Sequence, residues 1–160
     1  MHRIRVYADT SVFGGVEDPE FAEPSRRFFE RVRDGTFILV LSPFTVRELD
    51  AAPAPVKQLL EDLPPENVEH VEDDADVAAL ADSYIAAGVL SEACRMDALH
   101  VAAGTVGRAD LILSWNFKHI VNYQRIRRFN GVNALKGYAS IEIRSPLEVD
   151  YEDQDEDEVV

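Results

Sequence analysis

Cysteine is nearly absent from this sequence, and its scarcity excludes several kinds of site. Cys94 is the single cysteine among 160 residues, so the chain cannot form an internal disulfide. With no second cysteine nearby, the sequence predicts neither a zinc site nor a CxxC redox pair, and we interpret Cys94 as a helix filler.

Long apolar runs are missing as well. No stretch approaches the roughly 20 apolar residues of a membrane span. The opening MHRIRVYADT carries charges where a signal peptide has its apolar stretch. We therefore expect a cytoplasmic protein with no membrane partner. With 46% apolar residues in 160, the chain is long enough for one domain with its own core.

Basic residues are outnumbered, since 16 Lys and Arg face 30 Asp and Glu for a formal net charge of -14. Such a charge ordinarily argues against a nucleic-acid partner. The final EVDYEDQDEDEVV, however, is strongly acidic and contains no Lys or Arg. We predict a folded domain over 1–147 and a disordered acidic tail over 148–160, and the alternative that the tail gates a basic surface stays open.

Short apolar runs alternate with amphipathic segments along the chain. The expected strands are 4–8, 37–41, 67–71, 111–113 and 139–143. The expected helices are 20–33, 43–62 with a break near Pro53 and Pro55, 74–87, 92–106 and 122–136. This alternation predicts an α/β protein, with three α/β/α layers and a mostly parallel central sheet of about five strands.

Polar side chains cluster where the predicted strands end. Asp9 directly follows the first strand, Glu48 lies on the helix after the second, and Asn116 follows the fourth. Because ligands bind at the carboxyl ends of strands in open α/β sheets, these three are site candidates. Asp110 opens its strand and lies at the opposite edge, so we interpret it as structural.

Asp97 lies in CRMDALHVAAG, the most apolar helix of the chain, where an unpaired charge would cost several kcal/mol. Its partner is Arg95 or His100 in a structural network, or else a metal ion. Together with the three edge residues it makes an oxygen-only set without Cys or His. Such a set suits Mg²⁺ or Mn²⁺ rather than Zn²⁺, as in metal-dependent nucleases.

Other reaction classes lack their motifs. None of the four histidines has an evident Ser and Asp arrangement around it, so a serine triad is not predicted. GxGxxG and GxxxxGK are absent, and ADTSVFGG lacks the second Asp of a DxD phosphatase.

Four motifs occur in this order along the chain: YADTSVFGG, VREL, MDALHVAA and ADLILSWNFKHI. Together they make the chain resemble the PIN domain family from about residue 4 to residue 147. It is similar to the VapC-type toxins of bacterial toxin-antitoxin pairs. The resemblance implies metal ligation by Asp9, Glu48 and Asp97, with the hydroxyl of Thr10 or Ser11 close by.

The resemblance also concerns the end of the fourth strand. The family usually has a fourth acid two residues after a Thr or Ser, here Ser114, and Asn116 stands in its place. An amide oxygen can still coordinate a metal or a bound water. One missing charge should weaken a second ion more than the first.

The segment after the site is basic and aromatic. FKHIVNYQRIRRF suggests contacts with single-stranded RNA through Lys118, Arg125, Arg127 and Arg128, with base stacking on Phe117, Tyr123 and Phe129. The alternative is a solvated helix face whose aromatic rings turn into the core. We expect Trp115 to belong to the core.

Two functions remain open. One is a Mg²⁺- or Mn²⁺-dependent endoribonuclease in which a metal-activated water attacks phosphorus, as the toxin of a toxin-antitoxin pair with a cognate antitoxin. The other is a PIN-fold module that binds RNA or a protein without cleaving, its site degraded at Asn116. Three intact acids favour the first. A monomer and a homodimer both stay open.

Overall fold

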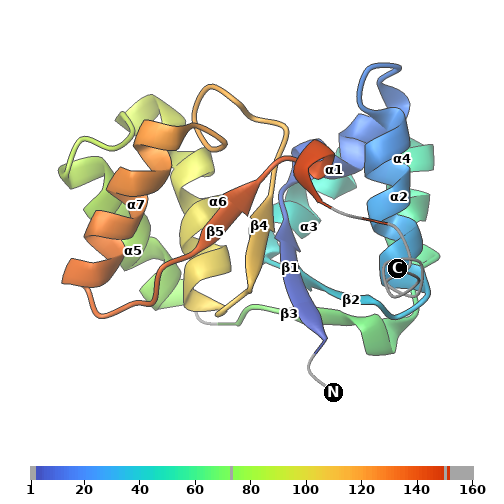
Figure 1. Ribbon diagram of the computed structural model, residues 1–160, viewed down its shortest axis with the longest axis horizontal. Helices are drawn as coiled ribbons and strands as arrows, with labels where there is room; N and C mark the ends of the chain where they lie inside the picture. The colour runs from blue at the N-terminus through green and yellow to red at the C-terminus, as the bar shows by residue number, and fades with distance from the viewer. Residues whose placement is uncertain (1–2, 73, 150, 152–160) are drawn as a thin grey trace, which may run out of the picture.

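A five-stranded parallel sheet forms the centre of the protein (Figure 1). The computed structural model describes residues 3–72, 74–149 and 151. The strand order is β3-β2-β1-β4-β5, and every neighbouring pair is parallel. The strands are β1 (Ile4–Ala8), β2 (Phe37–Leu41), β3 (Val68–His70), β4 (Leu111–Leu113) and β5 (Glu142–Arg144).

Helices cover both faces of the sheet, which confirms the predicted three-layer α/β/α class. Alternate residues of β1 point to opposite faces: Val6 and Ala8 pack in one core cluster and Tyr7 in the other. Figure 1 shows α5, α6 and α7 on one side of the sheet and α2 and α4 on the other. The helices are α1 (Thr10–Gly14), α2 (Ala22–Arg33), α3 (Pro43–Asp50), α4 (Ala54–Glu61), α5 (Asp74–Ala86), α6 (Arg95–Val106) and α7 (Tyr123–Leu135).

Most predicted elements lie close to where the sequence placed them, and two differ. The fifth strand begins at Glu142 rather than at 139, because the Asn130 side chain binds both the amide and the carbonyl of Ile141 (2.8 and 3.1 Å). The short helix α1 was not predicted. It starts directly after β1, where the Asp9 carboxylate caps it by accepting from the amide of Ser11.

The carboxyl ends of the strands form one edge of the sheet. Ala8 at the end of β1 lies in register with Leu113 at the end of β4, and the amide of Asp9 donates to the carbonyl of Leu113 (3.2 Å). Asp9 and Ser114 therefore leave the sheet side by side. Asp110 is at the other edge, as predicted, where its carboxylate accepts from the amide of Arg5 (2.9 Å).

The chain still packs beyond residue 147, the predicted end of the domain. Val149 and Tyr151 lie against the core cluster that contains Phe37, and the Tyr151 and Phe37 ring centroids are 6.5 Å apart. The rest of the acidic tail, at 150 and 152–160, lies outside the described residues.

Within the described ranges, no helix is both long enough and apolar enough to cross a membrane.

Candidate metal centre

Asp9 is the most deeply buried acid of the site, with 4% of its surface exposed. One carboxylate oxygen accepts from the amide and the hydroxyl of Ser11, and the other accepts from the Ser114 hydroxyl (2.6 Å). Burial raises the pKa of Asp9 above its usual range, against the lowering effect of His100 and these hydrogen bonds. Among the described residues no Lys or Arg pairs with Asp9. A buried carboxylate with such neighbours is a suitable ligand for a cation.

Asn116 lies next to Asp9 through a shared serine. The Ser114 hydroxyl donates to Asp9 and accepts from the amide of Asn116 (2.9 Å). The side-chain oxygen of Asn116 accepts from the amide of His119 (2.9 Å) and so holds the turn after β4. This oxygen already has one backbone donor, and its second lone pair remains for another partner.

Glu48 enters the same region from α3. One of its oxygens accepts from the Thr10 hydroxyl (3.0 Å) and from Nε2 of His100 (2.6 Å). The hydrogen bond from His100 lowers the pKa of Glu48 below its ordinary value. Ser42 caps α3, where its hydroxyl accepts from the amide of Thr45, and this cap fixes the start of the helix that carries Glu48.

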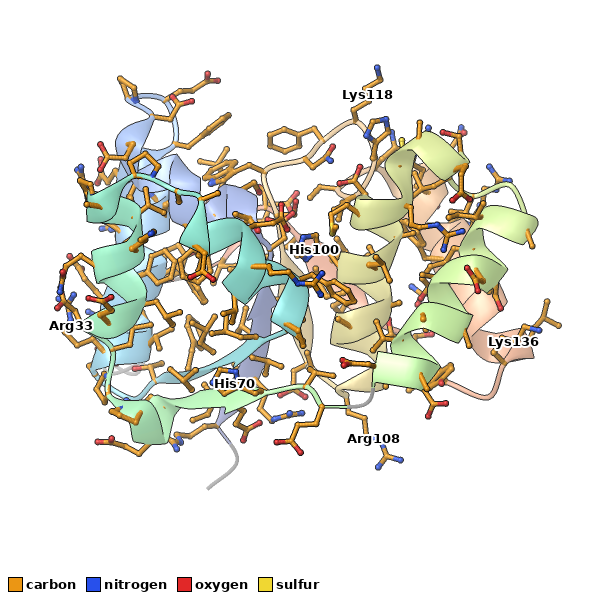
Figure 2. The ribbon with its side chains drawn as sticks, turned by 180° about the vertical axis from the view of Figure 1, so that it is seen from behind. Arg33, His70, His100, Arg108, Lys118 and Lys136 are labelled. Atoms are coloured by element: carbon orange, nitrogen blue, oxygen red, sulfur yellow. The ribbon has the colours of Figure 1, made fainter. Side chains whose placement is uncertain are left out.

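His100 connects Glu48 to a buried hydroxyl cluster. Figure 2 labels His100 near the middle of the molecule. Its side chain extends from α6 to Glu48 on α3, and its Nδ1 is 2.7 Å from the Tyr7 hydroxyl. That hydroxyl also lies 2.8 Å from the Ser42 hydroxyl and 3.3 Å from the Thr45 hydroxyl. Since an ionised Glu48 oxygen only accepts, Nε2 of His100 carries a proton, and in the neutral ring Nδ1 accepts from Tyr7. Burial raises the pKa of Tyr7 far above its usual range, so Tyr7 stays a donor.

Asp97 has a partner that the sequence did not suggest. Its carboxylate pairs with Nδ1 of His119 (3.2 Å), whereas Arg95 pairs with Glu92 and Asp82. Nor is Asp97 in the apolar part of its helix. It lies in the first turn of α6 with a quarter of its side chain exposed, and there the helix dipole favours an acid.

These contacts form two series that come close on α6. One series runs from Asp9 through Ser114, Asn116 and His119 to Asp97, and the other joins Thr10, Glu48 and His100. Asp97 and His100 are three positions apart on α6 and so share one of its faces. Carboxylate and hydroxyl oxygens of this kind are the ligands that Mg²⁺ and Mn²⁺ prefer.

A second group of ligand types adjoins these contacts. Among the described residues, one set of three Cys, His, Asp or Glu side chains has its ligand atoms within 4.8 Å of one another, namely Cys94, Asp97 and His119. Cys94 Sγ is 3.6 Å from Nε2 of His119. The interpretation of Cys94 as a helix filler is therefore incomplete, because a sequence gives no sign that residues 94 and 119 meet.

The predicted RNA-binding residues divide into two kinds. Arg125 donates to the carbonyls of Lys118 and Val89, and Arg128 donates to the carbonyls of Ala87 and Gly88 just after α5. Both guanidinium groups hold loops in place, and their role toward RNA stays a prediction.

Lys118 and Arg127 are placed differently from these two arginines. Figure 2 shows Lys118 projecting from the end of the molecule opposite Arg108. The Arg127 guanidinium lies 5.9 Å from the centre of the Tyr123 ring, which is 74% exposed. Phe117 is also exposed.

Two aromatic rings of this region belong to the interior. Trp115 is buried, as predicted, stacks on Phe21 and donates to the hydroxyl of Ser25 (2.9 Å). Phe129 is fully buried, so it does not face RNA.

No protein-family model matches the sequence, and no curated protein is significantly similar to it. Solved structures do match its fold. VapBC2 from Rickettsia felis, bound to a DNA fragment from its promoter, is 9% identical with a TM-score of 0.53, covering 89% of this chain and 98% of that chain. FitAcB from Neisseria gonorrhoeae is 15% identical with a TM-score of 0.54, covering 90% and 99%.

FitAB bound to an IR36 DNA fragment is similar as well, at 13% identity and a TM-score of 0.54, covering 91% of this chain and 97% of that chain. All three are toxin-antitoxin complexes whose toxins are PIN domains. TM-scores of 0.53 and 0.54 over nearly whole chains establish a shared fold, and identities this low establish the fold alone. The protein therefore has a PIN-like fold, which confirms the resemblance seen in its sequence motifs.

Proposed function

We propose that this protein is a Mg²⁺- or Mn²⁺-dependent endoribonuclease. The observation that supports the proposal is that Asp9, Glu48 and Asp97 lie toward the carboxyl edge of the sheet, each held by hydrogen bonds or an ion pair to its neighbours. A bound Mg²⁺ or Mn²⁺ would lower the pKa of a water ligand and neutralise charge on a phosphodiester.

Each side chain has a distinct task in this proposal. Asp9 supplies a buried carboxylate whose orientation is fixed by the hydroxyls of Ser11 and Ser114. Glu48 is held by His100 on one side and Thr10 on the other, so one of its oxygens is already oriented and the second is free to bind. Preorganised ligands lose less freedom when an ion binds.

Asp97 and Asn116 complete the set in different ways. Asp97 exchanges its contact with His119 for the ion. Asn116 contributes a neutral oxygen that the His119 amide also uses, so a second ion should bind more weakly than the first.

RNA is the proposed substrate, with Lys118 and Arg127 contacting phosphates and the exposed Phe117 and Tyr123 stacking on bases. The fold similarity to toxin-antitoxin complexes supports a role as the toxin of such a pair, in the cytoplasm, with an antitoxin partner. A small DNA-binding-like reading frame directly upstream of the gene would support this role.

One observation favours the second function, a module that binds without cleaving. Asn116 replaces an acid and its side-chain oxygen binds a backbone amide, as expected of a residue that now serves structure. On this reading the protein binds RNA or another protein without cleaving.

A fluorescent single-stranded RNA assay separates the two functions. We expect cleavage with Mg²⁺ or Mn²⁺, none with EDTA, and none for Asp97→Asn. Asp50→Asn is the matched control, because Asp50 is an exposed acid at the end of α3, the helix that carries Glu48. RNA that binds to the wild type but stays intact with either metal would favour the non-cleaving module.

A further inference from the structure

Cys94, His119 and Asp97 form a chain of contacts beside the oxygen ligands. The thiol of Cys94 is 3.6 Å from Nε2 of His119, and Nδ1 of the same ring is 3.2 Å from the Asp97 carboxylate. The three side chains come from two separate segments, since Cys94 and Asp97 flank the start of α6 and His119 follows β4. All three are half-buried, so solutes can reach them.

The chemistry of this group differs from that of the oxygen site. Thiolate and imidazole are the preferred ligands of Zn²⁺ and similar ions, whereas Mg²⁺ and Mn²⁺ prefer oxygen. In tetrahedral zinc sites the metal lies about 2.0 to 2.3 Å from each ligand. Donor atoms in such a site are therefore roughly 3.3 to 3.8 Å apart. The Cys94 and His119 atoms already meet this spacing.

The geometry points to a binding site for Zn²⁺, with Cys94 Sγ and His119 Nε2 as direct ligands and Asp97 as the positioning residue. Metal-bound imidazoles usually donate their other N–H to a carboxylate, which fixes the ring and increases its basicity. The contact between Nδ1 of His119 and Asp97 provides that arrangement. Zn²⁺ binding displaces the thiol proton of Cys94 to solvent, and water completes the coordination.

This site has a consequence for cleavage that rests on the proposed function. Asp97 belongs to both sets, because it orients His119 in one and binds Mg²⁺ or Mn²⁺ in the other. Zn²⁺ on Cys94 and His119 fixes the imidazole against Asp97 and so removes a ligand from the oxygen site. Zn²⁺ should therefore inhibit cleavage even when Mn²⁺ is abundant.

Titration of the full-length, reduced, metal-free protein with Co²⁺ tests the site without reference to RNA. Co²⁺ is a spectroscopic substitute for Zn²⁺, and a thiolate ligand gives it a near-ultraviolet charge-transfer band. We expect the band to saturate at one equivalent and to disappear in Cys94→Ser. In His119→Ala the affinity for competing Zn²⁺ should fall at least tenfold, whereas His70→Ala, at an exposed histidine on β3, should match the wild type.

No band in the wild type, or equal Zn²⁺ affinity in wild type and His119→Ala, would overturn the site. The RNA assay adds an independent arm, in which Cys94→Ser should cleave like the wild type but resist Zn²⁺. Equal inhibition of the two proteins would overturn the link to Asp97. A band that depends on Cys94 and His119 in a protein that cleaves no RNA would uphold the zinc site and contradict the nuclease.

Discussion

The substitution Tyr7→Phe removes one oxygen from the hydroxyl cluster behind the site. That oxygen is fully buried and lies within hydrogen-bond distance of Ser42, Thr45 and His100. Without it, Nδ1 of His100 has lost its partner in a dry interior. Leaving a buried polar group unsatisfied costs about 1 to 3 kcal/mol. For a chain of this length, that free energy lowers Tm by about 2 to 12 °C.

The same substitution should also weaken metal binding, since His100 orients Glu48. Losing an outer residue of this kind typically costs about tenfold to a hundredfold in metal affinity. Calorimetric unfolding and Mn²⁺ titration on Tyr7→Phe and on Tyr123→Phe, which alters an exposed tyrosine, would measure both effects. A Tyr7→Phe protein with wild-type Tm and wild-type Mn²⁺ affinity would refute the argument that the cluster supports Glu48.

Three further predictions concern single positions. Burial raises the pKa of Asp9, so ionisation of its carboxyl lowers the stability of the fold as the pH rises past the ordinary value of 3.8. Metal-free Asp9→Asn should therefore melt no lower than the wild type at pH 7, and the difference in Tm should shrink in acid. The variant should also gain no stability from Mn²⁺. A wild type that is more stable than Asp9→Asn in EDTA at pH 7 would contradict this. Asn116→Asp should bind a second ion more tightly than the wild type in calorimetry. Asn116→Ala should cleave RNA about tenfold to a hundredfold more slowly than the wild type, because a contact worth about 1 to 3 kcal/mol is lost. Equal affinity and activity in all three proteins would mean that Asn116 does not face the ion. Truncation after Tyr151 should leave Tm unchanged in scanning fluorimetry. Truncation after Val149 should lower Tm, because it removes Tyr151, which packs near Phe37. Equal Tm values for the two truncated proteins would show that this packing contributes no stability.

The sheet was predictable because each strand has its own local signal. FILVL is buried at all five positions, as its unbroken apolar run indicated, and the other long strand, IRVYA, becomes fully buried toward its site end. The start of β5 was not predictable, since it depends on the Asn130 side chain, eleven residues away from Ile141. Helix α1 has only five residues, which is too short to show a helical period.

The positions of the candidate site residues were predictable where they follow the ends of strands. Asp9 and Asn116 followed from their positions after β1 and β4, and both do lie beside Ser114. The pairing of His100 with Glu48 joins residues 52 positions apart, and no periodicity signals it. The spacing of Asp97 and His100 on α6 was the one available sign that both face the same region.

The partner of Asp97 shows a limit of a different kind. Arg95 and His100, near in sequence, were its candidate partners within the protein, with a metal ion as the alternative. His119 instead comes from a loop whose path depends on the Asn116 turn. Similarly, the tail looked uniformly solvated by composition, although the Tyr151 ring packs against the core. Composition describes a segment as a whole and does not locate a single aromatic contact within it.

We propose that Asp9, Glu48 and Asp97 share one divalent ion. Crystals of the Cys94→Ser protein soaked in Mn²⁺ test it most directly, because anomalous scattering locates the ion and this variant lacks the thiol of the zinc site. We predict a peak bonded to oxygens of Asp9 and Asp97, with Glu48 in its coordination shell. A peak that contacts none of these carboxylates, or no peak at saturating Mn²⁺, would contradict it.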